Sequence, residues 1–400
     1  MERSRAGGLA PYYLWELLAE FSFTAGVWIV YLQSRGFSLA EIGLAESVFH
    51  LAPVSLELLT GSLADLFGRK WSLALASLCA TASALLMLRA DSLWVVLPAM
   101  YLNGAFYAFR SGAGEAFMFD SLVAQGVADR FTGVLGKLYS AMYLVVAATT
   151  WVGGVLADRS FAVPYLLTAA VGAVGFVLAV SLREPARERT PQASVRRVFA
   201  EAAAVLRGQP GLPMLLVYVA ALWTLSTLVT LYAQAVLTEM GLPPSQVALV
   251  IGSTFLFTAA GALLAGRLSD RTGFRRWTLL ATAVGVAVAL ALGSQRLWLV
   301  LPVYVVAEFV FGAYEPMVSA RVNAGIGSAQ RATILSIQGF LFSITMIWAF
   351  PLFGAAAGRV GWLAAYAGAS AVVLLLFAAL LRFGPSREVG ESGGRAVEVG

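Results

Sequence analysis

Apolar residues in this chain gather into long runs that short polar segments separate. Each run is roughly 20 residues long, the length at which an α-helix crosses about 30 Å of hydrocarbon. The separating segments carry Gly, Pro, Arg and Asp, which end helices and favour turns. The pattern predicts twelve membrane-spanning helices, near residues 10–34, 40–62, 71–90, 92–119, 133–157, 161–182, 212–239, 245–265, 277–294, 297–319, 332–356 and 361–383.

The composition and the placement of charge fit a lipid-facing protein. Of its 400 residues, 60% are hydrophobic and only 12% are charged, whereas soluble domains have about 25% charged residues. Most of the 27 basic residues fall in the loops on the side of the N-terminus. The positive-inside rule therefore predicts that both termini are cytoplasmic, in a multi-pass protein of the cell inner (plasma) membrane. The net charge of +5 then reflects loop topology, and no nucleic-acid partner is expected.

Three pairs of similar segments recur at an offset of about 205 residues. GSLADLFGRK at 61–70 follows the second predicted span, and GRLSDRTGFRR at 266–276 follows the eighth. LWVVLP and LWLVLP open the fourth and tenth spans, and RFT and RAT precede the fifth and eleventh. These matches predict two related six-helix bundles, 1–182 and 211–384, joined by a cytoplasmic linker at 183–210 with a short amphipathic helix and followed by a cytoplasmic tail at 385–400.

The repeated loop is a candidate moving contact at the cytoplasmic membrane edge. A glycine there lets a neighbouring helix approach closely, and an aspartate can meet the positive end of a helix and a nearby arginine. A cluster that forms in one arrangement of the halves and breaks in the other would act as a latch. The predicted latch residues are Gly61, Asp65, Gly68, Arg69, Lys70, Asp120, Arg130, Gly266, Asp270, Gly273, Arg275 and Arg331.

The duplicated G-x-L-a-D-x-x-G-R-K loop resembles the hallmark loop of the major facilitator superfamily, and the resemblance covers the whole chain. Leu66 stands where the family often has Arg, and the second copy carries one inserted residue. Residues 110–114, RSGAG, resemble the fourth-helix R-x-x-x-G pattern that is associated with proton coupling in that family. The fifth-helix antiporter pattern is incomplete, because residues 149–154 end in Gly-Gly without a preceding Gly-Pro pair. The resemblance implies the two-bundle fold and transport by alternating access.

Ionisable residues inside the predicted spans are the candidate functional groups, because each costs about 2.5–3.5 kcal/mol to insert. Helical spacing places Glu16 and Glu20 on one stripe and His50 on another. Glu20 is either a proton-titrating or substrate-binding carboxylate or a structural partner of Arg110, and His50 is either a pH-sensitive site residue or a structural hydrogen-bonding group. The candidate proton-coupling and substrate-cavity residues are Glu16, Glu20, His50, Arg110, Glu308, Asn103, Gln234 and Gln338.

Several classes of function are disfavoured. The chain has no G-x-x-x-x-G-K-[ST] loop and no loop long enough for an ATPase domain. Its single His and single Cys supply no evident nucleophile–base pair and no metal-ligand set. We therefore expect no enzyme activity, no metal and no cofactor. The expected partners are a small-molecule substrate, protons as coupling ion and membrane lipids, with the protein acting as a monomer.

Mid-membrane acids outnumber the single Arg at that depth, which favours a cationic or neutral amphipathic solute. The sequence thus predicts a secondary active transporter, a proton-coupled antiporter that exports an amphipathic or cationic compound. One alternative keeps the fold but makes the protein a facilitator, a nutrient importer or a lipid translocator. A second alternative is a receptor that does not transport, although a static receptor has no evident need for a duplicated latch.

Overall fold

A computed structural model describes residues 10–111, 113–124, 127, 131–184, 206–209, 211–323 and 328–384. Within these ranges the side chains of 57–67, 115, 124, 131–133, 270–271, 323, 328–333 and 335–336 are not described. Most of the predicted linker at 183–210 and the predicted tail at 385–400 therefore lie outside the described residues. The regular elements of the described part are all helices.

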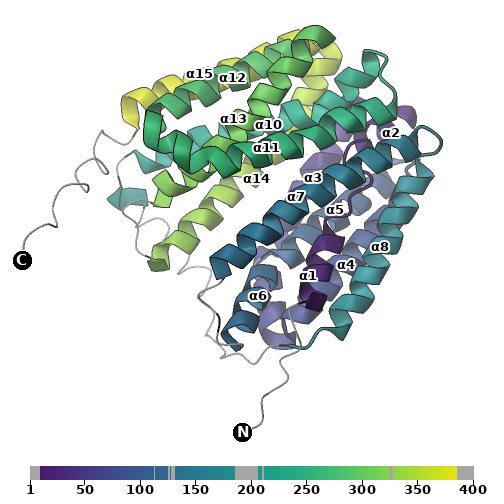
Figure 1. Cartoon of the computed structure of the whole chain (residues 1–400). Helices are drawn as coiled ribbons and strands as arrows, with labels where there is room; N and C mark the ends of the chain where they lie inside the picture. The colour runs from purple at the N-terminus through teal and green to yellow at the C-terminus, as the bar shows by residue number, and fades with distance from the viewer. Residues whose placement is uncertain are drawn as a thin grey trace, which may run out of the picture.

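The helices form two bundles that lie side by side (Figure 1). The N-terminal half contains α1 (Ala10–Ala19), α2 (Trp28–Ser34), α3 (Leu39–Phe67), α4 (Arg69–Met87), α5 (Leu93–Arg110), α6 (Ala113–Ala124), α7 (Phe131–Ala157) and α8 (Ala162–Ser181). The C-terminal half contains α10 (Leu212–Glu239), α11 (Pro244–Thr272), α12 (Phe274–Gly293), α13 (Leu297–Asn323), α14 (Ser328–Val360) and α15 (Trp362–Phe383).

Ten helices in the described part are long and apolar enough to cross a membrane, namely α3, α4, α7, α8 and α10 to α15. The first and fourth predicted spans differ from expectation, because each is divided. Turns at residues 20–27 separate α1 from α2, and a break at 111–112 separates α5 from α6. Both interruptions belong to the N-terminal half, and both adjoin the charged residues of the candidate site.

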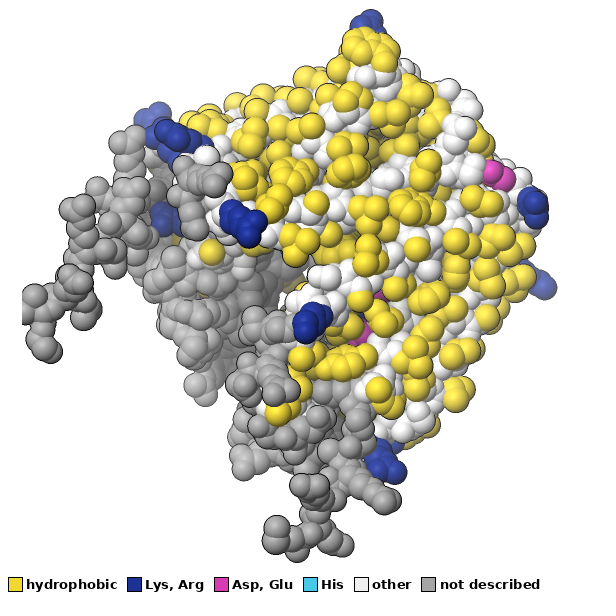
Figure 2. All heavy atoms as spheres, in the orientation of Figure 1, with side chains coloured by type: hydrophobic (Ala, Val, Ile, Leu, Met, Phe, Trp, Pro, Cys, Tyr) yellow, Lys and Arg dark blue, Asp and Glu magenta, His cyan; other side chains and the backbone are white. Residues whose placement is uncertain are grey.

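The sequence repeat is also a repeat of structure. Gly68 ends α3 with φ +103°, and Gly273 ends α11 with φ +76°. Glycine is the residue that adopts this left-handed region without strain, which explains its place in both loops. Trp94 and Trp298 are 88% and 72% exposed at the starts of α5 and α13, as suits aromatic residues at a membrane interface. Figure 2 shows a surface dominated by apolar side chains, in keeping with a lipid-facing protein.

The two halves pack together at the end of the molecule where α2 ends and α3 begins, which we call the α2 end (Figure 1). There Gly43 faces the backbone of Phe350, and a Cβ atom at Gly43 would lie 2.6 Å from the Phe350 carbonyl oxygen. Ser47 Oγ donates to the carbonyl of Ile347 at 2.8 Å. Helix α1 begins toward the opposite end of the molecule, and helix α15 ends toward it. The helix pairs α3–α14 and α7–α11 thus join the halves.

Candidate functional site

The interrupted first span is held open by close backbone packing. A Cβ atom at Gly153 of α7 would overlap the backbone of Phe23, and one at Gly26 would lie 2.9 Å from Cα of Ala248 in α11. The turn between α1 and α2 therefore touches both halves at positions where a side chain would not fit. This packing is a physical reason why residues 20–27 do not continue the helix.

Arg110, the last residue of α5, lies between two glutamates of the first span. Its Nη2 is 2.8 Å from Glu16 Oε2 and 2.6 Å from Glu20 Oε1. Its Nε also donates to Glu16 Oε2, at 3.0 Å. One guanidinium thus serves two carboxylates inside the protein, and the three side chains are 13%, 6% and 21% exposed for Arg110, Glu16 and Glu20.

The break between α5 and α6 completes the setting of Glu16. The Tyr12 hydroxyl lies 2.6 Å from Glu16 Oε1 and 2.7 Å from the carbonyl oxygen of Gly114 in α6. A Cβ atom at Gly114 would be 2.6 Å from Glu16 Oε1. The glycine of the R-x-x-x-G pattern is therefore the residue that leaves room for the carboxylate beside α6.

The two carboxylates are held unequally. Glu16 is bonded by two nitrogens of Arg110 and by the Tyr12 hydroxyl. The ion pair of Glu20 involves one nitrogen of Arg110, and its side chain is the more exposed. Glu16 is hence the more firmly held of the two carboxylates, and Glu20 has fewer contacts within the cluster.

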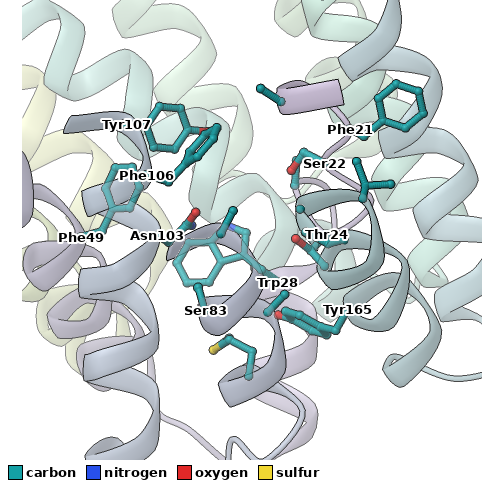
Figure 3. A pocket seen from close by; sticks show the side chains of 18 of the residues that line it. Phe21, Ser22, Thr24, Trp28, Phe49, Ser83, Asn103, Phe106, Tyr107 and Tyr165 are labelled. Atoms are coloured by element: carbon teal, nitrogen blue, oxygen red, sulfur yellow. The ribbon is translucent and has the colours of Figure 1, made fainter. Parts of the chain in front are cut away.

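A cavity of about 270 Å³ adjoins the broken first span. Phe49, Phe106 and Tyr107 lie on one side of it and Phe21, Ser22 and Thr24 on the other, with Trp28 between them (Figure 3). Asn103 and Glu46 also line the wall. Helices α4 and α8 form the floor, and Thr230, Leu231, Ile251 and Phe255 bring α10 and α11 of the C-terminal half to the rim.

His50 lies behind this wall and faces the other half. Its Nε2 is 3.4 Å from Glu46 Oε1, one helical turn away. Its ring meets Phe342 of α14 edge-on at 5.6 Å between ring centres. The structure therefore joins His50 to a carboxylate of the cavity and to the facing half, and places it apart from the Arg110 cluster.

The C-terminal half buries one carboxylate among hydroxyl groups. Glu308 of α13 accepts hydrogen bonds from Thr230 of α10 at 3.2 Å and from Thr258 of α11 at 3.0 Å. Among the described side chains, no basic group lies within ion-pairing distance of it. Thr230 also lines the cavity, so Glu308 contacts a residue of the cavity wall but does not itself line the cavity.

The sequence profile of the Major Facilitator Superfamily matches residues 16–238 and, a second time, residues 214–398. The chain belongs to this superfamily. The match confirms the family resemblance of the duplicated loop. No curated protein matches the chain in a sequence search.

Solved structures of superfamily transporters share the fold. A mutant of the nucleoside transporter NupG superposes with a TM-score of 0.76 at 15% identity, over 93% of this chain and 99% of that one. A POT family transporter in complex with a thioalcohol-conjugated peptide gives 0.71 at 11%, over 94% and 95%. A bacterial homologue of the human lysosomal transporter Spinster, inward-facing and unoccupied, gives 0.68 at 16%, over 93% and 95%. At these identities the likeness shows the fold alone, the one that these transporters share.

The first copy of the duplicated loop, at residues 61–70, forms polar contacts with residues that lie before the C-terminal bundle. Arg69 Nη1 lies 2.5 Å from Asp120 Oδ2 of α6. Glu184, just after α8, accepts from the backbone N–H groups of Arg69 at 2.7 Å and Lys70 at 3.0 Å. Glu184 thus caps the start of α4. The sequence analysis did not predict this contact, because no local pattern connects residue 184 with residue 69.

The remaining predicted residues fall into three groups. Gly266, Gly273 and Arg275 of the second loop are exposed. Asn103 lines the cavity, whereas Gln338 is half-buried and does not line it, and Gln234 lies buried between the halves. The surroundings of Gly61, Asp65, Arg130, Asp270 and Arg331 lie outside the described part of the chain.

Proposed function

We propose that the protein is a secondary transporter that exchanges protons for an amphipathic cationic solute and exports that solute by alternating access. The observation that carries the proposal is the cluster of Glu16, Arg110 and Glu20, none of which lines the cavity, although Ala19 and Phe21, the chain neighbours of Glu20, do. One buried and one partly exposed carboxylate share one guanidinium, so the cluster has room for one further positive charge.

The charge balance defines what the cluster can bind. With all three groups ionised it carries a net charge of −1, and an uncompensated charge is costly inside a membrane protein. A proton on Glu20 or the cationic group of a solute would each restore neutrality. Because both use Glu20, binding of one excludes the other, and this competition is the basis of antiport.

The cavity supports a cationic, partly apolar cargo. Trp28, Phe49 and Phe106 present aromatic faces to it, and such faces attract cations by roughly 0.5–2 kcal/mol. Its volume of about 270 Å³ is close to the lower end of small-molecule sites, which begin at roughly 300 Å³. These features favour an organic cation of small-molecule size over a larger cargo such as a peptide.

The proposed topology has twelve spans with both termini in the cytoplasm of a cell whose inner membrane holds the protein as a monomer. The first and fourth spans would cross as the broken pairs α1–α2 and α5–α6. The α2 end would then face away from the cytoplasm. Because the halves pack together there, the conformation would be open toward the cytoplasm, the side from which an exporter loads its cargo.

The first experiment measures transport of ethidium, an amphipathic aromatic cation, into liposomes with an imposed pH gradient. Wild-type protein should accumulate ethidium when the gradient is present. Glu20→Gln should lose gradient-driven uptake and keep ethidium exchange, because the amide cannot take or release a proton. Asp91→Asn, an exposed loop carboxylate replaced in the same way, is the control and should behave as wild type. Unchanged pH-driven transport by Glu20→Gln would remove the assignment of Glu20.

The second experiment tests the sign of the cargo. Thermal stability of the purified protein is recorded with cationic, neutral and anionic organic compounds across pH, since ligands of the folded state raise the apparent melting temperature. Because protons and cations would compete for one site, the stabilisation by cations should weaken as the pH is lowered. Stabilisation by anionic compounds alone would contradict a cationic cargo.

A further inference from the structure

The side-chain amide of Gln234 fills the gap in the first span. Its Nε2 donates to the carbonyl oxygen of Ala25 at 2.9 Å. Its Oε1 accepts from the backbone N–H of Ile29 at 3.2 Å. Gln234 is fully buried among apolar side chains of the interface between the halves, and its bond to Ile29 is buried, whereas its bond to Ala25 is partly buried.

The two backbone groups that Gln234 bridges are natural partners. In a continuous α-helix the N–H of residue 29 donates to the carbonyl of residue 25, four positions earlier. The turns at residues 20–27 separate this pair, and the amide inserts one donor and one acceptor between them. Without it, the fully buried N–H of Ile29 would have no partner, which is unfavourable in the interior of a membrane protein, and the partly buried carbonyl of Ala25 would lose its own.

Gln234 reaches this gap from the other half of the molecule. It belongs to α10, which corresponds to the first span in the repeat. Ile29 and Gln234 are 205 positions apart, the same offset that separates Gly68 from Gly273. Equivalent positions of the two halves therefore meet, as is expected where helices cross at the axis that relates the halves.

The gap is also part of the candidate site. Thr24 and Ala25 line the cavity, and Glu20 marks the start of the interrupted segment. A hydrogen bond that crosses between the halves thus reaches the chain segment that carries the exchangeable carboxylate. Any motion of α10 relative to α2 stretches these two bonds.

We propose that Gln234 is a positioning residue that holds the first span open while the halves are packed at the α2 end, and that the Ala25–Ile29 bond re-forms when they separate there. The proposal rests on the alternating access proposed above. Re-formation would wind residues 21–28 into the helix and turn Glu20 relative to Arg110. The position of the carboxylate would then depend on which side of the transporter is open.

Two pairs of spin labels test this in lipid nanodiscs, in a Cys79→Ala background. Leu14→Cys with Ser34→Cys reports the first span, because both side chains are exposed on either side of the break. A continuous helix would separate these positions by about 30 Å, or 20 residues at 1.5 Å each. Arg159→Cys with Arg296→Cys reports the separation of the halves, since these exposed residues follow α7 and precede α13 at the α2 end.

In Gln234→Leu the ratio of separated to packed molecules should rise about tenfold, since the buried N–H of Ile29 and the partly buried carbonyl of Ala25 lose their partners in the packed state. The Leu14–Ser34 distances should shift toward the continuous-helix value in the same sample. The proposal is overturned if that distribution matches wild type. Gln234→Met, of similar length and without polar atoms, repeats the test if Gln234→Leu does not fold.

Tyr232→Phe is the matched control. The Tyr232 hydroxyl, also on α10, lies 3.2 Å from the carbonyl oxygen of Leu39 and 3.1 Å from that of Phe350. Its loss weakens the contact between the halves and leaves the Gln234 bridge intact. Tyr232→Phe should keep the wild-type relation between the two distances, whereas Gln234→Leu, which lacks the bridge in the packed state too, should have a larger continuous-helix fraction at equal separation of the halves. If the two variants have the same continuous-helix fraction at equal separation, Gln234 only packs the interface and the proposal fails.

The wild-type protein gives a further test without any variant at position 234. Across pH 5 to 8, the separated fraction and the continuous-helix fraction should rise and fall together. A Leu14–Ser34 distribution that stays constant while the halves separate would overturn the proposal. These distance measurements need no solute, so their outcome is independent of whether the cargo and the role of Glu20 are correctly assigned.

Discussion

The two halves share one six-helix plan but treat polar groups in opposite ways. In the N-terminal half the first and fourth spans are interrupted, and the interruptions adjoin an ion cluster around Arg110. In the C-terminal half the corresponding helices α10 and α13 are continuous, and Glu308 accepts hydrogen bonds from Thr hydroxyls. A broken helix is tolerated in a membrane only where protein satisfies the freed backbone groups.

The comparison indicates that one six-helix plan can hold an ion-paired cluster in one half and only hydrogen-bonded polar groups in the other. Glu16 and Glu20 are paired with Arg110, which the end of α5 places between them. Gly114 leaves the space that Glu16 occupies. Glu308 needs only two hydroxyl groups that regular helices already present. Variants that affect the two halves differently can sharpen or break this view.

The largest effect is expected from Arg110→Leu, which leaves the buried Glu16 and the partly exposed Glu20 without their cation. Removal of one partner of a buried ion pair costs roughly 3–5 kcal/mol, so the free energy of unfolding should fall by about that amount and ethidium transport should stop. Denaturation in mixed micelles measures the first, and the liposome assay measures the second. Arg382→Leu, at the end of α15 on the surface, is the control. Wild-type stability in Arg110→Leu would show that the cluster is not what organises this half.

The second-largest losses of stability are expected from substitutions of the two loop glycines. Gly68→Ala and Gly273→Ala each place a side chain at positive φ, a strain of roughly 1–2 kcal/mol. Only Gly68 also faces a carboxylate, because a Cβ atom there would lie 3.0 Å from Glu184. Gly68→Ala should therefore destabilise more than Gly273→Ala, by roughly 1 kcal/mol if the helix-capping bonds of Glu184 are lost.

Thermal unfolding of both variants beside Gly136→Ala makes that measurement. Gly136 lies within α7, and nothing lies within 4 Å of a Cβ atom added there. Equal losses at Gly68 and Gly273 would mean that Glu184 moves aside without cost.

Gly114→Ala should have a smaller effect on stability but a clear one on coupling. The added methyl group displaces Glu16 from α6, and crowding of this kind costs roughly 1–3 kcal/mol. We expect a lower ratio of proton-driven to exchange transport in the ethidium assay. Gly339→Ala in α14, where the space is open, should leave the ratio unchanged. A normal ratio in Gly114→Ala would indicate that Glu16 can shift without disturbing Glu20.

The smallest effect is expected from Glu308→Gln. The amide keeps an acceptor for Thr230 or Thr258 and has nearly the same shape, and no described cation loses its partner. The free energy of unfolding should change by less than about 1 kcal/mol, as for a neutral hydrogen bond. A loss as large as that of Arg110→Leu in the same denaturation experiment would contradict the division between the halves.

The fold could be predicted from the sequence because membrane spans depend on composition over about 20 residues, and the repeat at residues 61 and 266 is visible along the chain. The two interruptions could not. Residues 21–27, FSFTAGV, are mostly apolar and contain no proline, so locally they continue a span. What opens them is Gln234, together with close packing at Gly26 and Gly153, and these partners are distant in sequence.

The candidate site was partly predictable for a related reason. Helical spacing indicated a stripe with Glu16 and Glu20, and charge alone suggested Arg110 as a partner of Glu20. The unequal hold on the two carboxylates depends on Tyr12 and on the break before Gly114. Glu184 gave no signal at all, because a carboxylate just after a helix has many possible partners.

The meeting of positions 29 and 234 also bears on why the two halves form one chain. A dimer of two identical six-helix subunits would bring the same residue from both sides to its twofold axis. Two isoleucines would leave a gap in either helix unfilled, and two glutamines would be directed at each other. An arrangement in which one partner gives a side chain and the other gives its backbone requires two different sequences. Divergence of the halves after duplication permits that difference, so an opened first span depends on two halves that are no longer identical.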